Sequence, residues 1–116
     1  MSKSQVPKVQ FILEMIENIE IIFQRHGGVA KALEDEIEAR AAILMYLMQI
    51  GETLRKLSPE IAAEYHLEVE IKGAYDVRNF IAHDYEGINL IVIEDILRDH
   101  LPSLKTKLKS LIEDIK

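Results

Sequence analysis

Hydrophobic residues recur every three or four positions along most of the chain, which is the spacing of an amphipathic α-helix. The clearest stripe runs from about residue 5 to 25 and stops at Gly27-Gly28, where paired glycines favour the end of a helix. Its apolar positions are Ile12, Met15, Ile16, Ile19, Ile22 and Phe23. We therefore expect the chain to begin with one long amphipathic helix.

A second stripe predicts one uninterrupted helix over about residues 33–57. Acidic residues 34–36 open this segment and Arg55-Lys56 close it, which is the charge order that the helix dipole favours. Its apolar positions include Ile37, Leu44, Leu47, Met48 and Leu54. The next residues, Ser58-Pro59, are typical of an N-cap and a first-turn proline, so a short helix is expected from there to about residue 65.

Two more helices are expected in the second half of the chain. One begins near Val69 or Ile71 and ends before Gly87, and Asn89 then caps a last helix that continues to about residue 112. Pro102 has no N–H to donate to the carbonyl four residues earlier, so this last helix should kink near residue 100 or divide in two. The pattern predicts an all-α, up-and-down four-helix bundle with an additional short helix.

Composition limits the domain count and the possible chemistry. The chain has 116 residues, which suits a single domain over residues 1–116, and no cysteine, which excludes disulfides and thiolate nucleophiles. No apolar run is long enough for a membrane span and no secretion signal is present, so we expect a soluble cytoplasmic protein. The net charge of −6 argues against strong binding to nucleic acid through phosphates alone.

Residues 75–85 carry the densest group of hydrogen-bonding and titratable side chains. Arg78 and His83 are five positions apart, which places them about 140° from each other around an ideal helix. Either Arg78 reaches around, or the helix is distorted, or another helix or a second subunit completes the site. An imidazole can move protons near neutral pH and a guanidinium can hold a phosphate, so the pair suits metal-free cleavage of RNA by its own 2′-hydroxyl.

The same segment resembles the HepT-like proteins of the HEPN superfamily, which are toxins paired with a minimal nucleotidyltransferase antitoxin, MntA. The family signature Arg-x4-His-x-Tyr is matched by Arg78, His83 and Tyr85, with Asn79 after the arginine. Supporting matches are Ile50-Gly51-Glu52 and Asp99-His100-Leu101-Pro102. Many relatives carry a Pro-Trp element shortly before the signature, and residues 66–73 lack it here.

The resemblance implies a homodimer in which two Arg-x4-His motifs face one cleft and act as a metal-independent endoribonuclease, with transfer RNA as one candidate substrate. It implies that His83 is the general acid and base, that Arg78 binds the scissile phosphate, and that Asn79 orients a phosphate oxygen or the His83 ring. It also implies that the antitoxin adenylylates Tyr85 and thereby blocks the site. No cofactor and no metal are expected.

Structural alternatives stay open for each of these residues. Arg78 could form an ion pair with Glu52, His83 could be a core histidine, and Tyr85 could simply pack at the end of its helix. Glu52, which follows Gly51, is expected behind the site, where this segment either fixes Arg78 or lets two helices approach closely. The rival function is a non-catalytic accessory subunit that binds nucleotides or docks on a nucleotidyltransferase. Met45, Tyr46 and Met48 are expected in the core and at a dimer interface.

Overall fold

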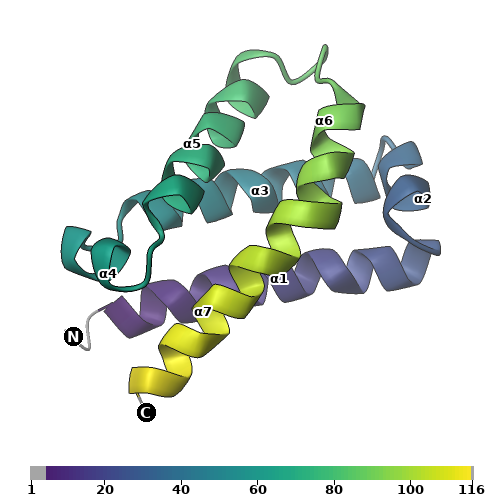
Figure 1. The fold of residues 1–116 in the computed structure, drawn as a ribbon. Helices are drawn as coiled ribbons and strands as arrows, with labels where there is room; N and C mark the ends of the chain where they lie inside the picture. The colour runs from purple at the N-terminus through teal and green to yellow at the C-terminus, as the bar shows by residue number, and fades with distance from the viewer. Residues whose placement is uncertain (1–4, 116) are drawn as a thin grey trace.

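The computed structural model describes residues 5–115, and every regular element in this range is a helix. The elements are α1 (Val6–His26), α2 (Val29–Glu34), α3 (Ala39–Arg55), α4 (Pro59–Glu64), α5 (Glu68–His83), α6 (Leu90–Asp95), the π-helical turn η2 (Ile96–His100) and α7 (Leu101–Ile115). Four long segments make up the body of the molecule: α1, α3, α5 and the continuous α6–η2–α7 rod (Figure 1). The predicted all-α fold is confirmed.

Helix α3 lies at the centre of the packing, because it contacts both α1 and α5, while α1 also contacts α7. The α5 helix and the α6–η2–α7 rod diverge from the loop that joins them and cross in front of α1 and α3 (Figure 1). The largest fully buried side chains come from all four long segments: Ile12, Ile16, Ile19, Ile43, Leu44, Leu54, Leu67, Ile81, Ile93, Leu97, Leu108 and Leu111. The predicted stripes therefore meet in one core.

Three predicted helix boundaries are confirmed, and each has a capping hydrogen bond. Helix α1 ends at Gly27, whose φ of 80° is left-handed and whose N–H donates to the Phe23 carbonyl. The Ser58 hydroxyl accepts a hydrogen bond from the Ile61 N–H at 3.3 Å and caps α4. The Asn89 side chain accepts from the N–H of Ile91 at 3.0 Å and caps α6 in the same way.

The prediction of one helix over residues 33–57 was wrong, because the chain breaks between α2 and α3. Asp35 accepts hydrogen bonds from the N–H groups of Ala39 at 3.0 Å and Glu38 at 3.3 Å, so its carboxylate starts a new helix. The turn leaves Ile37 87% exposed instead of in the core stripe where the periodicity placed it. The acidic run 34–36 therefore marks the junction of two helices and not the first turn of one.

The last helix changes to a π-helical turn just before Pro102, close to the predicted position. The five residues before Leu101 form a π-helical turn, in which the Leu101 N–H donates to the Ile96 carbonyl. This wider turn carries the chain past a proline that has no N–H to donate, and α7 then continues to Ile115. In the part of the chain that the structure describes, no helix combines the length and apolarity that crossing a bilayer requires.

Candidate active site

The site lies where α3 and α5 cross, and a glycine sets how close they come. A Cβ atom added at Gly51 would stand 2.6 Å from the Ala74 carbonyl oxygen and 2.9 Å from the Arg78 Cβ. Only glycine fits without moving one of the helices, since both distances are shorter than real Cβ contacts. The Ile50-Gly51-Glu52 segment thus lets α3 approach the backbone of α5 beside Arg78.

Arg78 uses two parts of its guanidinium group within the chain. Its Nε lies 2.6 Å from Glu52 Oε1, so the two side chains form an ion pair. The Nε–H is not directed at this oxygen and donates no hydrogen bond. Its Nη1 donates to the Asn79 side-chain oxygen at 3.0 Å. Both members of the ion pair are about one-third exposed, at 31% for Arg78 and 37% for Glu52. The structure therefore contains the ion pair that the sequence offered as an alternative, and Arg78 remains accessible from solvent.

A second arginine, which lies outside the signature motif, joins this group. Arg55, in the last turn of α3, donates from Nη1 to the Tyr75 hydroxyl at 2.8 Å, and its guanidinium carbon lies 4.4 Å from the centre of the Tyr75 ring. The Arg78 guanidinium carbon lies 5.9 Å from the same ring centre. The two helices run antiparallel, since Arg55 pairs with Tyr75 and Glu52 with Arg78. The sequence signal for Arg55 was its position one turn after Glu52 on the same face of the helix.

His83 and Tyr85 stand at the far end of α5 and are exposed. His83 is the last residue of the helix, and among residues 5–115 its side chain forms no hydrogen bond or ion pair. It does not contact Arg78, because five residues separate the two by about 7.5 Å along the axis as well as by rotation. Tyr85 follows in the loop and is 50% exposed. Within one chain, the structure therefore brings Arg78 to Asn79 and Glu52 but not to His83.

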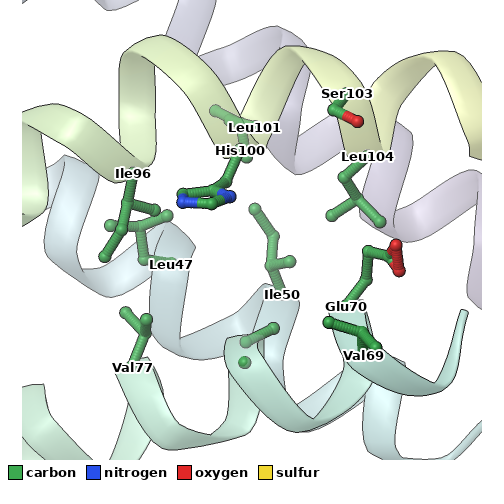
Figure 2. Close-up of a pocket in the computed structure, with 12 residues that line it drawn as sticks. Leu47, Ile50, Val69, Glu70, Val77, Ile96, His100, Leu101, Ser103 and Leu104 are labelled. Atoms are coloured by element: carbon green, nitrogen blue, oxygen red, sulfur yellow. The ribbon is translucent and has the colours of Figure 1, made fainter.

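The groove between α5 and the η2–α7 segment is a separate feature. Its volume is about 320 Å³, and Leu47 and Ile50 of α3 form its floor (Figure 2). Val69 and Val77 line it from α5, and the His100 imidazole points into it. None of the four signature residues lines this groove, so its apolar walls do not belong to the candidate active site.

Charged groups around α5 are mostly paired. On its outward face, the Lys72 ammonium donates to Asp76 at 2.8 Å, and this hydrogen bond raises the pKa of Lys72.

Among residues 5–115, no three histidine, aspartate or glutamate side chains gather closely enough to hold a metal ion. Lys105 and Lys107 of α7 form ion pairs with Glu20 and Glu70, so these lysines are engaged within the protein.

Comparison with known proteins connects this geometry to an activity. Residues 12–111 match the family described as "Ribonuclease HepT-like". A protein of Methanocaldococcus jannaschii named "Putative RNase MJ0127" is 28% identical over 107 residues, which cover 90% of this chain and 87% of that protein. "Putative RNase TTE0752" of Caldanaerobacter subterraneus is 24% identical over 105 residues, or 89% of this chain and 92% of that protein. No solved structure matches the chain.

Proposed function

Because the chain belongs to the HepT-like ribonuclease family of the HEPN superfamily, we propose that it is a metal-independent endoribonuclease and the toxin of a toxin–antitoxin pair. The observation that carries this proposal is that one helix, α5, presents both a guanidinium group, which can bind phosphate, and an imidazole, which can transfer protons. Arg78 is a partly exposed phosphate-binding group next to Asn79, and His83 is an exposed imidazole whose nitrogens have no partner in residues 5–115. RNA supplies the nucleophile for such a site.

The proposed reaction balances without a metal. The 2′-hydroxyl of the RNA gives its proton to a His83 imidazole and attacks the adjacent phosphorus, which forms the P–O2′ bond. Arg78 stabilises the charge that develops on the phosphate oxygens, and Asn79 holds the Arg78 guanidinium in place. The P–O5′ bond then breaks, and an imidazolium protonates the leaving oxygen. The products carry a 2′,3′-cyclic phosphate and a 5′-hydroxyl.

A homodimer would supply the groups that one chain keeps apart. Met45 is 54% exposed on α3, one turn before Gln49 and two turns before Glu52 on the same face. An exposed apolar side chain on the same helix face as Glu52 is suited to a subunit interface. A twofold axis near this face would bring the Arg78 of one protomer toward the His83 of the other. The proposed active site is therefore shared between two chains.

The first test is cleavage of RNA by purified protein in excess EDTA. We expect cyclic phosphate ends from the wild type and a loss of about 100-fold to 10,000-fold in rate for His83→Ala, the usual contribution of a general acid–base. His100→Ala is the matched control, since that imidazole lies in the separate groove. Intact, unmodified protein that cleaves no RNA would instead support the accessory-subunit function, in which Arg78 and His83 bind a ligand without reaction.

Mixing two inactive variants tests the shared site directly. Arg78→Ala and His83→Ala protomers, refolded together, form heterodimers that contain one intact Arg78 and one intact His83 on opposite chains. Recovery of cleavage in the mixture means that the two groups act across the interface. No recovery from a verified heterodimer means that each active site uses the Arg78 and His83 of one chain.

Tyr85 is the proposed target of regulation. Its side chain is half exposed in the loop after α5, two residues beyond His83, so a nucleotide attached to its hydroxyl would add bulk and negative charge beside the imidazole. The modifying partner is proposed to be a nucleotidyltransferase antitoxin. Tyr85→Phe should retain cleavage and escape neutralisation when the two proteins are co-expressed. A Tyr85→Phe protein that the antitoxin still neutralises would indicate occlusion without modification.

A further inference from the structure

Arg55 is fixed in orientation by a single aromatic side chain. Its Nη1 donates to the Tyr75 hydroxyl at 2.8 Å, and its guanidinium carbon lies 4.4 Å from the ring centre, within the range of a cation–π contact. A long side chain that two contacts already hold loses less conformational entropy when it binds a ligand. Arg55 is nevertheless exposed, so its other N–H groups can reach solvent or a ligand.

The charge of Arg55 is not neutralised by a carboxylate. Within residues 5–115, it takes part in no ion pair, as is also true of other cations such as Lys56 and Lys109, but its two contacts with Tyr75 distinguish it from them. This matters in a chain whose net charge is −6, because most of its surface repels phosphate. Arg55 is thus a preorganised cation, held by a neutral group, in an acidic protein.

Arg55 also lies close to Arg78. Both guanidinium groups approach the Tyr75 ring, so their central carbons can be separated by no more than the two ring distances together, about 10 Å. Neighbouring phosphates of a single strand can bridge that span. The direction from Arg78 to Arg55 leads along α5 away from His83, since Tyr75 precedes Arg78 and His83 follows it.

We infer that Arg55, positioned by Tyr75, binds a phosphate of the RNA backbone next to the scissile phosphate. The inference rests on the proposed ribonuclease function and identifies a second backbone contact for the same substrate. A guanidinium group can donate two parallel hydrogen bonds to phosphate oxygens. Such a contact binds the RNA backbone and does not depend on the base sequence. Tyr75 is in this scheme a positioning residue, because it acts on RNA only through Arg55.

A purely structural role for Arg55 has a different signature. The residue ends α3, where a cation interacts favourably with the helix dipole, and its bond to Tyr75 links α3 to α5. If this were its whole contribution, removal of the side chain would lower the midpoint of unfolding and leave the salt dependence of RNA binding unchanged. A phosphate contact instead releases counterions and therefore changes that salt dependence.

The test is binding of a fluorescent single-stranded RNA oligonucleotide, measured by anisotropy over a range of salt concentrations in the His83→Ala background so that the RNA stays intact. We expect Arg55→Ala to reduce the slope of log K against log salt by about 0.7, the value for one phosphate contact on a single strand. Arg55→Lys should keep the slope because it keeps the charge. Lys109→Ala, which removes an exposed cation from α7, is the matched control and should leave the slope unchanged.

The outcomes separate this inference from the function on which it rests. A wild type that neither cleaves nor binds RNA contradicts the proposed function. A wild type that cleaves RNA, together with an Arg55→Ala slope equal to that of the Lys109→Ala control, overturns the phosphate contact alone.

If Arg55→Ala does not fold, Tyr75→Phe removes only the hydroxyl that orients Arg55. It should then raise KM and leave kcat unchanged, and an unchanged KM would overturn the positioning role.

Discussion

Replacing Gly51 with alanine tests whether the close approach of α3 and α5 is required for the site. The new Cβ would lie 2.6 Å from the Ala74 carbonyl oxygen and 2.9 Å from the Arg78 Cβ. The first of these atoms is backbone and the second is fixed to it, so neither can rotate away. The helices must separate by several tenths of an ångström, or the protein must lose stability.

Two opposing terms set the size of the effect. Alanine is favoured over glycine inside a helix by about 1 kcal/mol, while overpacking a tight contact costs about 1–3 kcal/mol. The overpacking term should exceed the propensity term here because the clash involves backbone. The difference between the two terms is about 0–2 kcal/mol, so we expect Gly51→Ala to lower the free energy of unfolding by up to about 2 kcal/mol, and the melting temperature by about 4–8 °C per kcal/mol.

Gly73→Ala is the control on the partner helix. Nothing lies within 4 Å of a Cβ added at Gly73, which is exposed on α5. The same propensity term acts there without a clash, so this variant should be more stable than the wild type by about 1 kcal/mol in urea unfolding. RNA cleavage should fall in Gly51→Ala, because α5 carries Arg78, and should persist in Gly73→Ala. A Gly51→Ala protein as stable as Gly73→Ala would refute the close-approach argument.

Three further predictions concern single contacts. The hydrogen bond from the Ala39 N–H lowers the pKa of Asp35 in the folded protein. The ionised Asp35 carboxylate therefore contributes its full stabilisation above the ordinary pKa of 3.8, and this stabilisation is lost as the pH falls through the lower native pKa. In urea unfolding, the stability difference between wild type and Asp35→Asn should shrink as the pH falls below 3.8. Ser58→Ala removes the α4 cap and should cost about 1 kcal/mol in the same assay, whereas an unchanged midpoint would mean that water replaces the cap. Glu52→Gln keeps an acceptor for Arg78 but removes a negative charge, so it should tighten RNA binding in the anisotropy assay; weaker binding would show that the charge is needed to orient Arg78.

Local chemistry explains which parts of the fold could be predicted from the sequence. Ser58 and Asn89 cap the helices that follow them through bonds spanning two or three residues, so the sequence contains both partners. The break at Asp35 has an equally local cause, yet an acidic run also suits the first turn of a helix. The choice between a break at Asp35 and one continuous helix depended on whether Ile37 is buried, and burial is a property of the tertiary structure.

Part of the candidate site could be predicted from the sequence. The signature proposed Arg78, Asn79, His83 and Tyr85, whose roles stay a prediction, and the position of Glu52 one helix away suggested the ion pair that the structure contains. Arg55 was missed because its partner, Tyr75, is 20 residues later and meets it only when α3 and α5 pack antiparallel. The spacing argument that Arg78 and His83 are not neighbours holds within the chain, but how a second protomer places them stays a prediction.

The ion pair between Arg78 and Glu52 is compatible with a catalytic role because the guanidinium has several edges. Nε lies 2.6 Å from Glu52 Oε1 and Nη1 donates to Asn79, and within residues 5–115 Nη2 donates no hydrogen bond. The two contacts therefore fix the plane of the group and leave one edge for a phosphate oxygen. Since both charged side chains are about one-third exposed, solvent already weakens the pair, and phosphate binding need not break it. Under the proposed function, Glu52 would orient Arg78 and, by its negative charge, moderate the affinity of the free edge for the anions of RNA.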